Sequence, residues 1–414
     1  MSMHNAKNSS VRFVDSWASV NFDLWRGLAA FLVFFGHWRN LLFVDFPSLT
    51  THRRLLTPLY VLAGGGHQAV VLFFILSGYF IGGTVLRALE RDQWEWVGYL
   101  LRRIVRLWTV LVPALLLCLF WDRLGIHLGH APALYGGHVP NNVVLYDTAS
   151  RLAPHIFLGN LFFLQTILTP FLGTNGALWS LANEFWYYIL FPLGVIVLWR
   201  TSRLAHRLIC AALFAATAWF VGAGILLNFL IWLAGVALFL LPAPSFTPRT
   251  GRHLRLGATL IYLPIFFFFG RHPMVSGLIR DYLLTVFTFP YLWVLLSAKE
   301  RYPAGARSVP VSRELARFSY TLYAAHVPLL VFLVALVQGD SRWYPTPIHL
   351  LAGAGLIITA FGYAYVLAIL TEFRTDTIRL RLEKLFGIGT VLHPLPSNPS
   401  LDTARDGTPI ATND

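Results

Sequence analysis

The chain consists of long apolar stretches that alternate with short polar segments. Stretches long enough to cross a bilayer begin near residues 24, 68, 105, 178, 207, 225, 256, 280, 315 and 347. Residues 156–172 are also apolar, but Pro154, Pro170 and Gly173 interrupt them. We therefore expect an all-α integral membrane protein with about ten transmembrane helices and one re-entrant or interfacial helical segment at 156–172.

The two ends of the chain differ from this apolar part. Residues 1–20 are polar and contain no apolar core followed by a small-residue cleavage site, so the first helix is expected to remain as an uncleaved anchor. The other end is rich in Pro, Ser, Thr and Asn, which favours disorder. The expected organisation is a cytoplasmic tail at 1–20, a transmembrane domain at 21–386 and a disordered cytoplasmic tail at 387–414.

Composition and charge support the same class. Hydrophobic residues make up 56% of the chain and charged residues 12%, with a mean hydropathy of +0.61, which is typical of a polytopic membrane protein. The net charge of +13 is spread over loops beside the spans, so we expect no nucleic-acid partner. With ten crossings, most Lys and Arg residues fall on one side of the membrane, which places both termini in the cytoplasm.

The cysteines and the loop histidines predict neither a disulfide nor a metal site. Cys118 and Cys210 both lie in apolar segments and are expected to be small core residues. The longest loop on the opposite side of the membrane, residues 122–155, carries four histidines whose spacing matches no standard zinc pattern.

His37 is the most informative single residue, because it lies inside the first apolar run. An ionisable group at that depth needs a cavity or a partner and usually marks a functional site. The 11 positions from Arg26 to His37 return to about the same helix face, roughly 16 Å apart along the axis. Asp23 falls near the same stripe, so one helix face is expected to carry a carboxylate, a guanidinium and a deeper imidazole.

A basic cluster at Arg102, Arg103 and Arg106 precedes the third span. Charge alone favours a positive-inside anchor on anionic lipid. The alternative is a site for a phosphorylated ligand, since guanidinium groups bind phosphate bidentately. A nucleotide with a flexible pantetheine arm, meaning an acyl-CoA, could place its phosphates here and its thioester near His37.

Two further ionisable residues lie inside apolar runs. Glu184 lies about two turns into the fourth span, where a carboxylate needs a partner or a wet cavity. His326 lies halfway along a later span, and either a functional role or simple satisfaction by a neighbouring hydroxyl would explain it. Trp179, at the start of the fourth span, fits an aromatic belt as well as a site.

Taken together, these stretches resemble the membrane-bound acyltransferase 3 family of bacterial O-acyltransferases. The residues that match its motifs, in chain order, are Asp23, Arg26 and His37; the FFILSGY segment with Ser77; Arg102, Arg103 and Arg106; Trp179, Ser180, Leu181, Glu184, Tyr188 and Pro192; and Ser319, Tyr320, Tyr323, His326 and Pro328. Five motifs in register over residues 23–328 make the resemblance specific. The chain ends soon after its last span, so the stand-alone form without an SGNH hydrolase-like domain is expected.

The resemblance implies an acyl-CoA-dependent O-acyltransferase of the bacterial cytoplasmic (inner) membrane, with acetyl as the expected acyl group. The acceptor would be a hydroxyl of an extracytoplasmic or lipid-linked glycan. His37 is the expected general base, with a nucleophilic role as the less favoured variant. Glu184 would orient the imidazole or bind the acceptor, and Asp23 would pair with Arg26.

The arginines of the first and third spans would bind the donor, and the remaining motif residues would support the site or bind substrate; these are Asp23, Ser77, Trp179, Ser180, Tyr188, Tyr320 and His326. The alternative from another class is a proton-coupled secondary transporter that uses His37, Glu184 and His326 as a relay. Both classes need ionisable residues within the membrane. The arginine cluster, which a carrier does not need, favours the enzyme.

Overall fold

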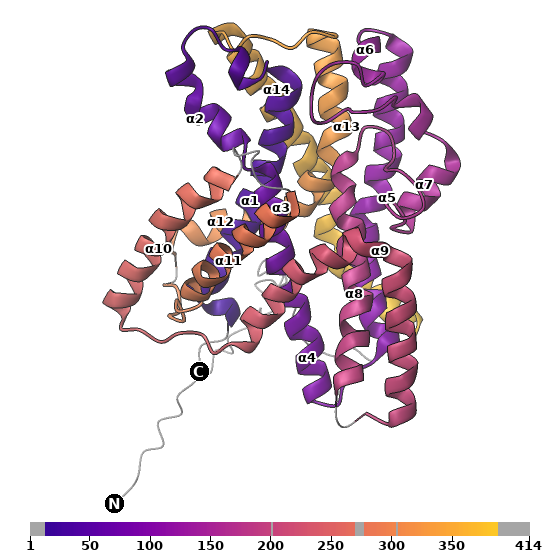
Figure 1. Cartoon of the computed structure of the whole chain (residues 1–414), viewed down its shortest axis with the longest axis vertical. Helices are drawn as coiled ribbons and strands as arrows, with labels where there is room; N and C mark the ends of the chain where they lie inside the picture. The colour runs from indigo at the N-terminus through magenta and orange to yellow at the C-terminus, as the bar shows by residue number, and fades with distance from the viewer. Residues whose placement is uncertain (1–12, 200–201, 270–276, 304, 388–414) are drawn as a thin grey trace, which may run out of the picture.

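A computed structural model describes residues 13–199, 202–269, 277–303 and 305–387, and its architecture is all-helical within those ranges (Figure 1). The helices are α1 Trp17–Leu42, α2 Arg53–Ala63, α3 Gly66–Ser77, α4 Gly83–Glu90, α5 Trp96–Leu128, α6 Pro132–Tyr135, α7 Pro154–Leu161, α8 Trp179–Leu198, α9 Leu204–Leu240, α10 Pro248–Phe269, α11 Gly277–Leu295, α12 Ser308–Arg317, α13 Ser319–Gln338, α14 Pro347–Leu370 and α15 Thr375–Leu385. A π-helical turn, Gly78–Gly82, joins α3 to α4. The predicted fold class is confirmed.

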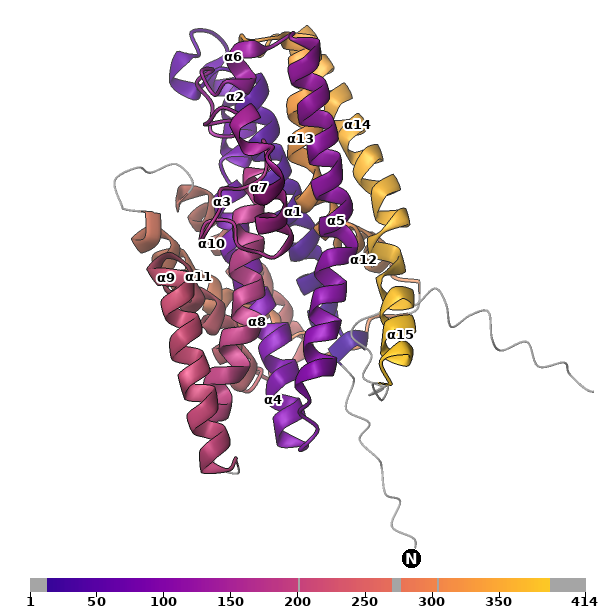
Figure 2. The ribbon, with the colours of Figure 1, turned by 90° about the vertical axis from the view of Figure 1, so that its right-hand side faces the viewer.

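The helices run between two ends of an elongated bundle. Figure 2 shows α4 and α15 toward one end, called here the α4–α15 end, and α2 and α6 toward the other, called the α2–α6 end. In the part of the chain that the structure describes, eight segments are long and apolar enough to cross a membrane by length and composition. The prediction of about ten crossings stays a prediction, although each of the ten expected start points lies in or within a few residues of a helix.

A kink explains part of the difference between eight and ten. The spans expected near residues 207 and 225 are the two halves of α9, which bends at Gly222 (φ 75°, ψ 174°). A backbone with this positive φ is open to glycine and strained for other residues. Of the segment expected to be re-entrant or interfacial, 156–172, only the part up to Leu161 is helical. It belongs to α7, whose eight residues extend only about 12 Å and cannot cross a hydrocarbon core of about 30 Å.

α1 is the central helix of the bundle. It packs against α2, α3, α12 and α13, and most of its apolar side chains are buried in the main core cluster. Ser16 caps its first turn by accepting a bond from the Ser19 amide at 3.4 Å. The stripe of Asp23, Arg26 and His37 therefore lies among other helices, and each of the three residues is partly exposed.

Two glycines allow α3 and α9 to approach closely. A Cβ on Gly78 would lie 1.9 Å from the Trp232 carbonyl oxygen, and a Cβ on Gly235 would lie 1.9 Å from the Ile75 carbonyl oxygen. No side chain fits at either position, so this contact requires glycine on both helices. It fixes the depth of Ser77, the residue before Gly78.

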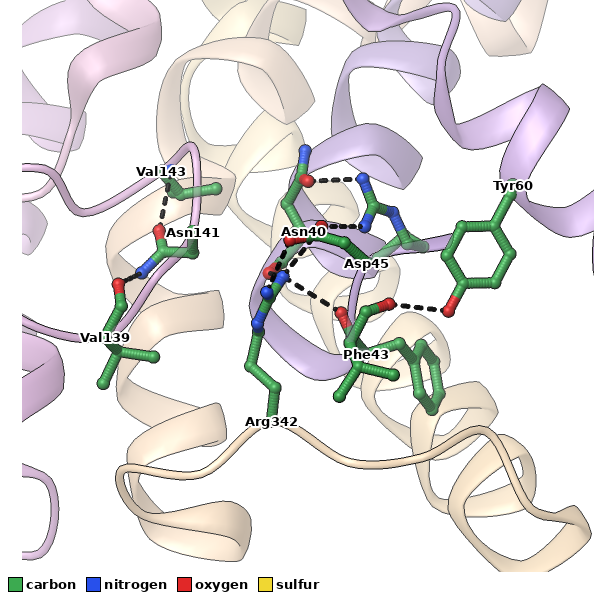
Figure 3. Close-up of polar contacts among 10 residues, drawn as sticks. Asn40, Phe43, Asp45, Tyr60, Val139, Asn141, Val143 and Arg342 are labelled. Atoms are coloured by element: carbon green, nitrogen blue, oxygen red, sulfur yellow. Dashed lines mark hydrogen bonds and ion pairs between the residues drawn. The ribbon is translucent and has the colours of Figure 1, made fainter. Parts of the chain in front are cut away.

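At the α2–α6 end, an ion-pair cluster ties the loop after α1 to the loop after α13 (Figure 3). Arg342 contacts the two carboxylate oxygens of Asp45 at 3.1 and 2.7 Å, and Arg39 contacts Oδ1 at 3.0 Å. The Trp343 amide also donates to the Leu42 carbonyl at 2.7 Å. The ends of the two helices that carry the histidines are thereby joined.

Candidate active site

The two intramembrane histidines predicted from separate motifs lie against one another. His37 Nδ1 on α1 is 2.8 Å from His326 Nε2 on α13, and the two rings are nearly parallel, with centroids 5.1 Å apart. His326 is 0% exposed, whereas His37 is partly exposed. The sequence placed these residues 289 positions apart, and the packing of α1 on α13 brings them into one hydrogen-bonded pair.

The backbone of α13 fixes the hydrogen positions in this pair. His326 Nδ1 is 2.7 Å from the Leu322 carbonyl oxygen and 3.1 Å from that of Tyr323. Because a carbonyl only accepts, Nδ1 of His326 carries the proton, and in a neutral ring Nε2 is then the acceptor. His37 must donate from its own Nδ1. Its Nε2 is left with a lone pair, which is the form a general base requires.

The first turn of α8 is fastened to α13 beside this pair. The Tyr323 hydroxyl donates to the Ala177 carbonyl at 2.7 Å and lies 2.5 Å from Ser180 Oγ. The side-chain amide of Asn175 donates to the Ala324 carbonyl at 2.8 Å. Ser180, expected as a supporting residue, thus helps to hold the start of α8 against α13, one turn from His326.

Glu184 lies one helical turn deeper on α8 and contacts other polar residues. Its Oε1 accepts from Ser77 Oγ at 3.0 Å and from the Tyr188 hydroxyl, and Ser77 in turn accepts from Trp232 Nε1 at 3.1 Å. No side chain in the described ranges donates to Oε2, and Glu184 makes no hydrogen bond to His37. The residue that orients the His37 imidazole in this structure is His326.

The charged end of the α1 stripe joins arginines and carboxylates from four helical segments. Arg26 and Asp23 form the expected ion pair at 3.4 Å. Arg26 also interacts electrostatically with Arg106, Glu184 and Glu372. Glu372 is fixed by accepting from the Thr321 amide at 3.0 Å and its hydroxyl at 2.8 Å.

The three arginines of the basic cluster have three different environments. Arg102 pairs with Glu383 of α15 at 3.4 Å. Arg103 is 2% exposed and lies over the rings of Tyr99 and Tyr188, 5.7 and 5.9 Å from their centroids, so its contacts stabilise the fold. Arg106 is the member whose charge interacts with those of Arg26 and Glu372, repelling the first and attracting the second.

The two remaining motif residues make contacts between helices. The Tyr320 hydroxyl donates to the Leu107 carbonyl at 3.0 Å, which ties α13 to α5 one turn beyond Arg103. Trp179 packs edge-on against Phe74, with centroids 6.0 Å apart. Two groups of side chains are distinguished here: the histidine region (His37, His326 and their fastening on α8) and the arginine region (Asp23, Arg26, Arg106 and Glu372).

Sequence reasoning missed three polar residues at this site. They are Glu372, which completes the arginine region, and the pair of His67 and Asp281, whose contact is described below. Glu372 gave no signal because it follows the last apolar run and belongs to none of the motifs. His67 and Asp281 stand at the polar starts of their apolar runs, beside Gln68 and Arg280, so they lacked the signal that singled out His37.

Comparison with known proteins agrees with the motif pattern. A family model described as an acyltransferase domain matches residues 19–367, which confirms the resemblance. A protein of Komagataeibacter xylinus named "Putative membrane-bound transacylase BcsY" is 30% identical over 202 residues, covering 44% of this chain and 47% of that protein. The chain thus spans about half the length of the curated relative it matches. No solved structure shows a significant match.

Proposed function

This chain belongs to the acyltransferase 3 family, and on that premise we propose that it is a membrane O-acyltransferase that uses cytosolic acyl-CoA. The acceptor is a hydroxyl of an extracytoplasmic or lipid-linked glycan, and acetyl is the expected group. The observation that carries this proposal is the bond between His37 Nδ1 and His326 Nε2, because it leaves a basic nitrogen on a partly exposed ring inside the bundle.

The proposed reaction is a direct transfer. Nε2 of His37 takes the proton from the acceptor hydroxyl as its oxygen attacks the thioester carbonyl carbon. The new C–O bond forms, the C–S bond breaks, and the proton passes from His37 to the departing CoA sulfur. His326 Nε2 accepts from His37 Nδ1 throughout, which stabilises the transient imidazolium in the way that a third residue orients the base in other acyl-transfer enzymes.

The arginine region supports the proposed donor. Arg26 and Arg106 come from α1 and α5 and share one electrostatic environment with Glu372. Fixed guanidinium groups recognise phosphates by paired hydrogen bonds. The spacing of roughly 16 Å along α1 between Arg26 and His37 suits a ligand with a charged head and a flexible arm ending in a thioester, which is the form of acyl-CoA.

The same placement supports an orientation in the bacterial cytoplasmic membrane. The arginine region lies nearer the start of α1 and the end of α14, and α15 with its basic residues follows on that side. If this α4–α15 end faces the cytoplasm, both termini are cytoplasmic, in agreement with the positive-inside rule. Donor and acceptor then reach the His37 imidazole from opposite sides.

The test is transfer of radiolabel from acetyl-CoA into glycan and lipid fractions of membranes from the native host. We expect label with the wild type and loss of at least about a thousandfold with His37→Ala. His349→Ala is the matched control, because His349 is bonded to the Tyr344 carbonyl at the α2–α6 end, away from the His37–His326 pair. Equal label with wild type and His37→Ala would contradict the assignment of the base.

A further inference from the structure

A second imidazole that the proposed reaction does not use lies at the depth of His37. His67 stands in the first turn of α3, next to Gly66. A Cβ on Gly36, the residue before His37, would lie 3.8 Å from Gly66 Cα and 3.0 Å from the Ala63 carbonyl oxygen. α1 and the start of α3 therefore meet one residue away from each histidine, and the two imidazoles belong to the same level of the bundle.

Asp281 of α11 holds the His67 ring. Its carboxylate oxygens are both 2.9 Å from His67 Nε2, and Asp281 is only 6% exposed. Since an ionised carboxylate only accepts, Nε2 carries the proton, and in the neutral ring Nδ1 has the lone pair. Nothing in the described ranges bonds to Nδ1, and the His67 side chain is 40% exposed.

Trp179 connects this pair to the histidine region. Its ring is nearly parallel to that of His67, at 15°, with centroids 6.3 Å apart. Trp179 is partly exposed, and the next residue, Ser180, bonds to Tyr323, one turn before His326. The indole of Trp179 and the Nδ1 lone pair of His67 thus lie on the same side of the bundle as His37, the proposed base.

We propose that His67, Asp281 and Trp179 form the subsite that binds the sugar ring of the acceptor, an inference that rests on the proposed function. The apolar face of the ring packs on the indole, and one hydroxyl donates to His67 Nδ1. A neighbouring hydroxyl donates to His37 Nε2 and is acylated. A polyhydroxylated ring is the class of acceptor that supplies an apolar face and two donors at once, whereas water or a simple alcohol engages His37 alone.

A purely structural role makes a different prediction from this subsite. If the His67–Asp281 pair only fastens α3 to α11, its loss should lower stability and reduce every reaction at His37 together. A subsite instead affects transfer to the glycan and leaves hydrolysis of acetyl-CoA by water unchanged. The ratio of the two reactions separates the alternatives without knowledge of the acceptor.

The experiment uses radiolabelled acetyl-CoA and native-host membranes containing the full-length protein, with label counted in the carbohydrate fraction and as free acetate. His67→Gln keeps an amide donor for Asp281 but has no group in the place of Nδ1. We expect about a tenfold loss of transfer, as for one hydrogen bond to substrate, with free acetate and the thermal midpoint unchanged. Trp179→Leu, which leaves the hydrogen bond between His67 and Asp281 intact, should give the same selective loss.

Each other outcome has a defined meaning. Equal transfer by wild type and both variants overturns the subsite. A parallel fall in transfer and hydrolysis, or a lower thermal midpoint with normal selectivity in Trp179→Leu, overturns it in favour of a fastening role. A wild type that labels neither fraction defeats the proposed function itself, whereas a wild type that transfers while the variants keep its selectivity defeats only this inference.

Discussion

The histidine region and the arginine region share helix α1, yet they satisfy their polar groups in opposite ways. In the histidine region one chain of bonds runs from the Leu322 carbonyl through His326 to His37, and no charged side chain bonds to either ring in the described part of the chain. In the arginine region several opposite charges from three helical segments interact at once. The arrangement of the histidine region depends on which ring nitrogens carry protons. That of the arginine region depends on the sum of several charges.

This difference predicts how each region responds to substitution. A linear chain of hydrogen bonds loses its function when any one member is removed, because the tautomer of the last ring is no longer fixed. A cluster of charges loses affinity in steps, because each remaining group still contributes. The histidine region should therefore control turnover, and the arginine region should control the concentration of donor needed.

Among the substitutions that test this difference between the two regions, those at His326 should have the largest effect on activity. His326→Ala removes the acceptor for His37 Nδ1, and we expect kcat to fall about a hundredfold while the KM for acetyl-CoA changes little. His326→Gln places an amide oxygen near the position of Nε2 and should recover most of the loss. Steady-state transfer by purified protein in lipid vesicles measures both constants.

A structural effect of the His326 substitutions has a separate signature. His326 is fully buried, so His326→Ala also leaves a cavity and should lower the thermal midpoint. If His326→Gln is equally stable but recovers no activity, the orienting role is wrong. If both variants raise KM for the donor and leave kcat unchanged, the division of labour between the regions is wrong as well.

A smaller effect is expected at Arg106. Arg106→Ala should raise the KM for acetyl-CoA about tenfold, with kcat nearly unchanged, because one phosphate contact is lost. The difference should shrink at high salt, which screens the remaining long-range attraction. Arg87→Ala is the matched control: this arginine lies toward the same end, over the Phe239 ring and bonded to the Gly83 carbonyl. An equal rise in KM for both variants would show a general effect of charge.

Much of the fold was accessible from the sequence, because helices in a bilayer must be long and apolar. The apolar runs located the membrane helices, and the ionisable residues inside them located His37, Glu184 and His326. The kink at Gly222 was not predicted, since a lone glycine in an apolar run is common in membrane helices. The pairing of His37 with His326 was equally inaccessible, because it depends on how α1 and α13 pack.

The individual environments of the three clustered arginines could not be predicted from the sequence. Spacing placed Arg102, Arg103 and Arg106 on about one turn, which suggested a single phosphate site. In the structure the three arginines do lie on about one turn of α5. Each of them faces a different neighbour, however, and Arg103 is buried over two tyrosine rings. Helix periodicity gives the direction of a side chain, whereas its environment depends on helices distant in sequence.

The smallest effect is expected at Asp45, outside both regions. Hydrogen bonds from Arg342, with a smaller contribution from Arg39, hold the pKa of Asp45 below its ordinary value. A carboxyl group with a depressed pKa in the folded state adds stability above its unfolded pKa of about 3.9, and this contribution disappears as the pH falls through the lower folded value. Since the Asp45 side chain is 50% exposed, solvent screens much of the interaction.

Asp45→Asn should therefore lower the thermal midpoint at pH 7 by only about 1 °C, and wild type and variant should begin to converge as the pH falls below about 4. Melting curves in detergent at pH 7, 5 and 3.5 measure this convergence. Since Asp45 joins the loops after α1 and α13, any change in activity should appear in kcat, through the histidine pair, before it appears in the KM for the donor. A change in the KM for the donor alone would mean that the loss of the Asp45 bonds reaches the arginine region without passing through the histidine pair. The two regions would then not be independent.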